Sequence, residues 1–395
     1  MKNNFNIQLS EDHKSIPYLF WIPKLHKNPY KSRFIAGASK CTTKQLSVEV
    51  TLCLKEIKNH FRKYCKTAFR RSGFNGFWSI YNSVDFISKT KNLEAKSIQC
   101  FDFSTLYTNL PIEKVKGALN KLITKVFTHN HSNYITINKY MKSARWTTNP
   151  SKNYNQKSYT IEDLISSIDF LLDNTFVQFG PFMFHQIKGI PMGGNCSPLL
   201  ADLYLTWLEF EYMENLNKNK NEEEQVLVNK LSQNSRYIDD IACPNIDNFL
   251  EIAKHIYPDD IPLDGNNSEL KRDVFLDLDI RASDKGFIIK IFNKTDDFNF
   301  DVINYPFPDS NISKSIGYNT FSSEILRFGR VCTLFKDFSI RVINIYNKLK
   351  SRGYEDYYLN KYFFKFCCKY PDIVSKYGYS DFSEFKKACF SLDNQ

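Results

Sequence analysis

The sequence has no long apolar run and no cysteine or histidine spacing typical of a metal site. No stretch approaches the ~20 apolar residues that cross a bilayer, and the N-terminus lacks a signal-peptide run. None of the 10 cysteines forms a Cys-x-x-Cys pair, which argues against a zinc finger and favours reduced core thiols. No internal repeat, Ser/His/Asp arrangement or Walker-type loop is visible. We therefore expect a soluble intracellular protein without a membrane partner, and no feature distinguishes nucleus from cytoplasm.

Aromatic residues and positive charge are what the sequence does contain. It has 34 Phe and 23 Tyr, rings that fill cores and can also stack on bases. Lys and Arg number 53 against 43 Asp and Glu, a net charge of +10. That excess favours a polyanionic partner, although many soluble proteins are mildly basic. The 395 residues suffice for two or three packed subdomains.

Apolar spacing predicts a chain of mixed helices and strands. The period over residues 45–63 predicts an amphipathic helix, with Lys55, Lys58 and Arg62 facing outward. Residues 98–103 predict a buried strand, and residues 145–160 a surface loop. Further predicted elements are a helix from about residue 113, a helix over 161–172, a strand pair over 176–184, a helix after 197, strands at 275–280 and 286–292 joined as a hairpin, and basic helices from about 322.

Two adjacent aspartates, Asp239 and Asp240, interrupt the apolar run Tyr-Ile-Asp-Asp-Ile-Ala. Strand interiors disfavour aspartate, so the pair is expected at a hairpin turn facing a cation. Asp102 ends another apolar strand and offers a third carboxylate. Three carboxylates would repel one another unless divalent cations balance them, and Mg²⁺ prefers oxygen ligands. Two such ions can activate a 3′-hydroxyl and stabilise leaving pyrophosphate, with Asp102 and Asp239 the direct ligands and Asp240 less directly placed. An Asp-Asp pair alone more often marks a solvated turn.

Three other features fit a nucleotide or nucleic acid, and each also has a simpler structural explanation. The Gly-rich loop 189–198 allows close backbone approach, or it simply connects a strand to a helix. Lys24, Lys27 and Arg33 could neutralise a triphosphate, or they form an exposed basic face. The C-terminal cations could meet phosphates, or belong to an ordinary amphipathic bundle. These cations are Lys348, Arg352, Lys361 and Lys365.

Taken in order, these segments resemble the reverse transcriptase domain family, and within it the Penelope-like group and related animal proteins. Residues 22–27 (Ile-Pro-Lys-Leu-His-Lys) and 33–37 (Arg-Phe-Ile-Ala-Gly) look like fingers motifs. Residues 101–111, 189–198 and 237–240 look like palm motifs A, B and C. The match runs over roughly residues 18–375, and the motif order makes the combination specific.

The resemblance implies an α+β, right-hand polymerase of retroelement type. Its expected parts are an N-terminal segment with fingers (1–95), an antiparallel-sheet palm (96–295) and a basic helical thumb (296–395). It further implies that Lys24 and Arg33 hold the incoming triphosphate and that Tyr107 excludes the ribose 2′-hydroxyl. Met192, where many reverse transcriptases carry Gln, and Gly193 would border the nascent base pair. No GIY-YIG endonuclease, ribonuclease H or integrase-like segment is visible, so autonomous mobility is not expected.

Three functions follow as alternatives. The first is an RNA-directed DNA polymerase, a nucleotidyltransferase that uses Mg²⁺ or Mn²⁺, deoxynucleoside triphosphates and a primed RNA or DNA template. The second is a domesticated, catalytically silent nucleic-acid-binding protein of the same fold. The third is a polymerase with another template or primer preference, including template-independent addition. The sequence does not indicate an oligomeric state.

Overall fold

The chain forms two compact units in a computed structural model that describes residues 5, 7, 15–24, 31–219, 221–265, 269–298 and 305–391. Unit 1 comprises Met1–Ser79 and Phe101–Gly265, and unit 2 comprises Ile80–Cys100 and Asn266–Gln395. The predicted divisions after residues 95 and 295 remain predictions. No helix among the described residues is long and apolar enough to cross a membrane. All 10 cysteines are free thiols.

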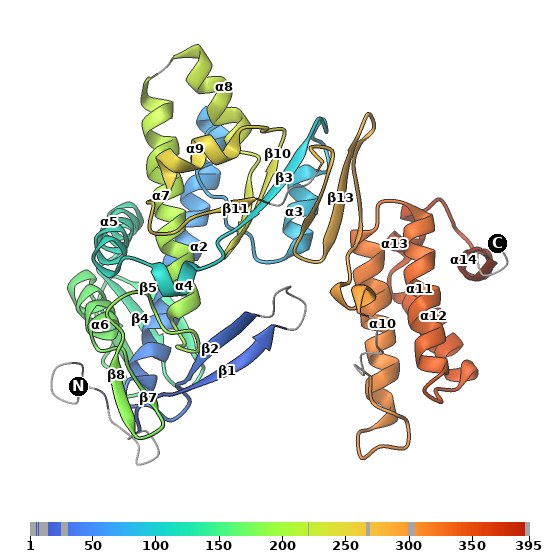
Figure 1. The fold of residues 1–395 in the computed structure, drawn as a ribbon, viewed down its shortest axis with the longest axis horizontal. Helices are drawn as coiled ribbons and strands as arrows, with labels where there is room; N and C mark the ends of the chain where they lie inside the picture. Colours follow the sequence, from blue (N-terminus) through green and yellow to red (C-terminus); the bar gives the residue numbers. More distant parts are fainter. Residues whose placement is uncertain are drawn as a thin grey trace. The chain divides into compact units, whose positions relative to one another are not determined.

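Unit 1 contains helices packed on small sheets (Figure 1). Its strands are β1 (Tyr18–Lys24), β2 (Lys31–Gly37), β4 (Tyr134–Asn138), β5 (Ser143–Thr147), β6 (Gln156–Tyr159), β7 (Phe176–Phe179), β8 (Phe182–His185), β9 (Ser235–Tyr237), β10 (Asp240–Pro244) and β11 (Asp264–Gly265), together with the end of β3 (Ile98–Asp102). Its helices are α2 (Lys44–Ser72), α4 (Leu106–Asn109), α5 (Ile112–Asn130), α6 (Ile161–Asp173), α7 (Ser197–Asn219), α8 (Glu222–Leu231) and α9 (Phe249–Ile256).

Three sheets order these strands as β2-β1-β7-β8, β11-β3-β10-β9 and β5-β4-β6. The hairpins β1–β2, β7–β8 and β9–β10 are antiparallel, whereas β1 meets β7 in parallel at Tyr18 and Gln178. Helix α7 packs against α2, α5, α8 and α9 and is buried on most sides, as a helix at the centre of a core must be.

Helix α2 follows the predicted period, with one exception. The inward residues Val50, Leu54, Ile57 and Phe61 are fully buried. Lys58, predicted to face outward, is buried instead, and its ammonium lies 2.7 Å from Asp202 on α7. An ion pair inside the core thus offsets the cost of burying this amine, which the spacing of α2 alone could not indicate.

The predicted loop over residues 145–160 is wrong in part, because β5 and β6 flank β4 in a three-stranded sheet. The side-chain contacts from the central strand β4 to β5 and β6 are polar. The hydroxyl of Thr136 lies 2.7 Å from the hydroxyls of both Thr147 and Ser158. Polar strands of this kind lack the apolar alternation that identifies a strand in sequence.

Unit 2 joins a three-stranded sheet to a helical C-terminal part. The sheet, ordered β12-β13-β14, consists of β12 (Arg272–Phe275), β13 (Leu278–Ser283) and β14 (Gly286–Ile291). Its helices are α3 (Ser83–Thr90), η1 (Lys294–Asp297), α10 (Lys314–Val331), α11 (Phe335–Lys350), α12 (Asp356–Lys369), α13 (Pro371–Lys376) and α14 (Phe382–Phe390).

Residues 275–280 do not form the single strand expected from their alternation. Phe275 pairs with Leu278 across a turn in which Leu276 takes a positive φ of 58°. A hairpin therefore replaces the continuous strand. The second hairpin, β13–β14, has its turn after Ser283 as predicted.

Candidate active site

The aspartate pair lies at a tight hairpin turn, as the sequence predicted. Tyr237 of β9 pairs with Asp240 of β10, so Ile238 and Asp239 form a two-residue loop. Ile238 has φ 56°, while Asp239 is not among the positive-φ residues, the combination that defines a type II′ turn. A β-branched residue at positive φ is an outlier that costs on the order of 1–3 kcal/mol, and such strain concentrates at functional sites.

Asp102 ends β3, the neighbour of β10 in the same sheet. The backbone N–H of Phe103 donates to the carbonyl oxygen of Asp239 at 3.1 Å, which ties the end of β3 to the turn. Two carboxylates that lie 137 positions apart in the sequence are thereby brought to one place.

The charge of Asp102 affects the pKa of Asp239. Burial raises the pKa of Asp239, and the negative charge of Asp102 raises it further. The positive charges of Arg33 and Lys24 act in the opposite direction. The site is therefore a pair of repelling carboxylates with two cations nearby, and its unfavourable charge could be neutralised by a divalent cation.

Arg33 and Lys24 come from the β1–β2 hairpin. The register pairs Ile22 with Arg33 and Lys24 with Lys31, so Arg33 and Lys24 project from the same face of the hairpin. Both cations lower the pKa of Asp239, which indicates that this face of the hairpin lies toward the carboxylates. The structure therefore brings the predicted triphosphate-binding cations to the predicted metal ligands.

Asp240 begins β10 and is half-buried. Within the described part of the chain, no group of three or more His, Cys, Asp or Glu side chains is close enough to hold a metal ion unaided. The oxygen-only pair Asp102 and Asp239 fits Mg²⁺, provided that water and phosphate oxygens complete its coordination.

Tyr107 lies beside the same carboxylate. It is half-buried in the short helix α4, and its pKa is raised to about 12 by burial and then by the charge of Asp239. The ring is therefore a neutral phenol close to Asp239, where it could contact the sugar of a nucleotide.

The Gly-rich loop leads from β8 into α7 and is hydrogen-bonded to both α4 and β2. The N–H of Ile190 donates to the carbonyl of Tyr107, and the N–H of Ala36 donates to the carbonyl of Met192, both at 2.7 Å. Gly193 has φ 118°, and a Cβ at this position would collide with the backbone oxygen of Ala36. Met192 is half-buried and Gly193 exposed, so the loop can present these two residues to a ligand.

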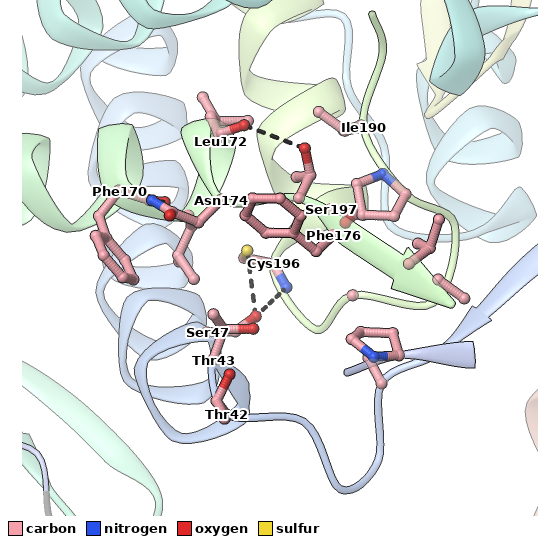
Figure 2. A pocket seen from close by; sticks show the side chains of 18 of the residues that line it. Thr42, Thr43, Ser47, Phe170, Leu172, Asn174, Phe176, Ile190, Cys196 and Ser197 are labelled. Atoms are coloured by element: carbon pink, nitrogen blue, oxygen red, sulfur yellow. Dashed lines mark hydrogen bonds between the residues drawn. The ribbon is translucent and has the colours of Figure 1, made fainter. Parts of the chain in front are cut away.

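A cavity of about 200 Å³ borders this loop (Figure 2). Ile190, Pro191 and Cys196 line it together with Phe176. The Ser47 hydroxyl donates to Sγ of Cys196 and accepts from its backbone N–H, both at 3.2 Å, which fixes the start of α7 on α2. Its described lining includes none of the predicted site residues, and it is mainly apolar.

A buried charged cluster next to the turn was not predicted. Arg236, Asp202 and Glu209 are each almost completely buried, and Lys58 joins them. A sequence signal existed, because Asp202 and Glu209 are seven residues apart on the apolar helix α7 and so share one face. Their partner on β9 could be found only from the tertiary structure.

The predicted nucleic-acid-binding cations of unit 2 have different surroundings. Arg352 donates to the carbonyl of Tyr305 at 2.9 Å and stacks over Phe307, and the Lys348 ammonium lies 5.7 Å from the Tyr305 ring centre. These two side chains hold the segment before α10, whereas Lys361 and Lys365 are exposed on α12. Lys348 and Arg352 are half-buried, and the Lys365 ammonium lies 5.1 Å from the Tyr362 ring centre.

Comparison with solved structures identifies the fold. Telomerase from Candida albicans, in complex with a TWJ fragment of telomeric RNA, matches 97% of this chain with a TM-score of 0.61 and 12% identity. Apo telomerase from Candida tropicalis matches 98% of the chain with a TM-score of 0.47 and 12% identity. The matched regions cover 64% and 66% of those telomerase chains, so this chain spans somewhat less than two thirds of their length.

The chain therefore has the α+β, right-hand fold of reverse-transcriptase-like polymerases, as the sequence predicted. No protein-family model and no curated protein sequence matches it. At 12% identity the likeness defines the fold and leaves the activity to the arrangement of the site.

Proposed function

We propose that the chain is an RNA-directed DNA polymerase that adds deoxynucleotides to a primer 3′ end. The observation that carries this proposal is the juxtaposition of Asp102 and Asp239 at a strained hairpin, with Arg33, Lys24 and Tyr107 around them. A carboxylate whose pKa is shifted, lying near cations, is typical of a catalytic site. The Candida albicans telomerase of the same fold was solved with RNA, which supports a nucleic-acid partner.

Asp102 and Asp239 would bind two Mg²⁺ ions, or Mn²⁺, with Asp240 contributing from the start of β10. The ions supply activation of the primer hydroxyl and stabilisation of the leaving pyrophosphate. In the transfer, the primer 3′-oxygen loses its proton and bonds to the α-phosphorus, and the bond from that phosphorus to pyrophosphate breaks. Arg33 and Lys24 would orient the triphosphate and offset its charge.

Tyr107 would select the sugar, since a bulky ring beside the ribose disfavours a 2′-hydroxyl. Met192 and Gly193 would border the new base pair from the loop fixed to Ala36. Lys361 and Lys365 would meet nucleic-acid phosphates, and Lys348 and Arg352 would contribute mainly by holding the segment before α10. The order of motifs over residues 22–37 and 101–111 favours the Penelope-like group within this class.

Primer extension on RNA and DNA templates tests the proposal. The wild type and Asp239→Ala are compared under varied Mg²⁺ and Mn²⁺, with Glu251→Gln as the control. Glu251 is exposed on α9, and its replacement by Gln also removes one carboxylate. We expect extension by wild type and Glu251→Gln and none by Asp239→Ala. RNA binding without extension by the wild type would instead support a catalytically silent binding protein, and products without a template would support terminal addition.

A further inference from the structure

The buried cluster beside the hairpin is organised around one guanidinium. Arg236 is 0% exposed in β9. Its Nε donates to Glu209 at 2.5 Å, and Nη1 donates to Asp202 at 2.8 Å. Nη2 donates to Glu209, to the hydroxyl of Thr206 and to the carbonyl of Asp202. Three positions on one helix therefore fix the plane of this side chain.

The same guanidinium also contacts the turn. Nη1 of Arg236 donates to the carbonyl oxygen of Ile238 at 3.0 Å, and the backbone N–H of Arg236 donates to the carbonyl of Trp78 at 2.9 Å. The Ile238 carbonyl belongs to the peptide that directly precedes Asp239. Arg236 thus links the central helix α7 to the peptide bond between Ile238 and Asp239.

The orientation of that peptide decides where Asp239 points. In a two-residue hairpin, flipping the central peptide converts a type II′ turn into a type I′ turn, which requires positive φ at the second residue as well. Asp239 would then change its backbone conformation, and its side chain would point elsewhere. The hydrogen bond from Arg236 to Ile238 favours the observed orientation.

The electrostatics of the cluster does not suggest a purely stabilising role. Arg236 and Lys58 balance Asp202 and Glu209, but buried ion networks often contribute no more stability than apolar residues of similar volume. Such networks do fix the orientation of the side chains that they join. A lysine at 236 would keep the charge, yet it could not reproduce the planar fork that reaches two carboxylates and the turn together.

We propose that Arg236 is a positioning residue, which holds the Ile238 carbonyl and thereby aims the carboxylate of Asp239 at a divalent cation. This inference rests on the proposed function, in which Asp239 binds that cation. It assigns the buried cluster a role in metal affinity and not only in folding.

Arg236→Lys tests the inference, and Lys58→Met is its matched control. Lys58 belongs to the same buried cluster, because its ammonium lies 2.7 Å from a carboxylate oxygen of Asp202. Metal affinity is measured without turnover by titrating Tb³⁺, an oxygen-seeking ion whose luminescence is sensitised by nearby tyrosines such as Tyr107 and Tyr237. Asp239→Asn shows how much of the signal comes from this site.

We expect Arg236→Lys to raise the half-saturating Tb³⁺ concentration about tenfold or more, the factor for losing a hydrogen bond from a charged donor. Lys58→Met should lower thermal stability but change that concentration by less than about twofold. Adding Ile238→Gly to Arg236→Lys should recover part of the affinity, because glycine is the residue that best fits the first position of a type II′ turn. If Arg236→Lys does not fold, Thr206→Val, which removes one acceptor of the guanidinium, is expected to shift the titration more than Lys58→Met does.

Equal titrations for Arg236→Lys and Lys58→Met would overturn the inference, as would Tb³⁺ binding that Asp239→Asn leaves unchanged. Primer extension then separates this inference from the proposed function. Suppose that the wild type binds Tb³⁺ through Asp239, that Arg236→Lys weakens this binding, and that the wild type never extends a primer. This result would refute the polymerase proposal and leave the positioning role of Arg236 standing. With extension present, the half-activating Mg²⁺ concentration should rise in Arg236→Lys while KM for the deoxynucleotide stays constant.

Discussion

Replacing Gly193 by alanine should disconnect the Gly-rich loop from β2. Gly193 has φ 118°, where a residue with a Cβ is strained by on the order of 1–3 kcal/mol. The added Cβ would also collide with the carbonyl oxygen of Ala36, a backbone atom that cannot rotate away as a side chain could. Moving the loop breaks the 2.7 Å hydrogen bond from Ala36 to Met192, which contributes about 1 kcal/mol. Together these effects predict a loss of about 2–4 kcal/mol.

Hydrogen exchange at the Ala36 amide measures this loss locally, because the amide is protected by the contact that should break. Gly180→Ala is the control: Gly180 also has a positive φ, 59°, but a Cβ there meets nothing within 4 Å. It should cost only about 1–2 kcal/mol, the penalty for a left-handed residue, and leave Ala36 protected. Gly193→Ala should expose Ala36 and reduce primer extension. Unchanged Ala36 protection in Gly193→Ala would refute the steric argument.

Three further predictions concern charge and shape. Burial and the charge of Asp102 raise the pKa of Asp239, so ionisation of Asp239 destabilises the metal-free fold as pH rises. Asp102→Asn should raise the melting temperature at neutral pH in chelator and abolish extension, and an unchanged melting temperature would contradict the repulsion. Tyr107→Ala should increase ribonucleotide incorporation; unaltered sugar selectivity would refute the assigned role. Burial and the neighbouring His129 lower the pKa of His60, so stability should fall as pH drops below about 6.5, and urea unfolding of His60→Gln should show a weaker fall.

Much of the fold could be predicted because local pattern and tertiary environment agree. The buried face of α2 and the hairpin at Asp239 follow from apolar period and from the cost of burying aspartate in a strand. The incorrect predictions concern residues whose structure depends on contacts with residues distant in the sequence. Lys58 is buried because Asp202 receives it, and β5 and β6 exist because hydroxyl groups pair across β4. None of these partners is adjacent in sequence.

The candidate site shows the same division. Asp102, Asp239 and the cations of the first hairpin were chosen by residue type and motif order, and the structure brings them together. Nothing in the sequence distinguishes Arg236 from an ordinary strand residue, because its importance lies in contacts with α7 and with the Ile238 carbonyl. Side chains that act on substrate can be inferred from chemistry, whereas those that hold them in place need the fold.

The costs concentrated at this hairpin bear on the choice between polymerase and silent binding protein. Ile238 is held at a positive φ, Asp239 is half-buried near another carboxylate, and Arg236 is sequestered from water. The positive φ and the carboxylate repulsion each lower the stability of the fold, and burying Arg236 adds little to it. A protein that only binds nucleic acid would use basic and aromatic surface and would gain nothing from a repelling carboxylate pair aimed by a fixed turn. A metal-dependent enzyme gains its reaction centre from the same three features, and this asymmetry favours the polymerase.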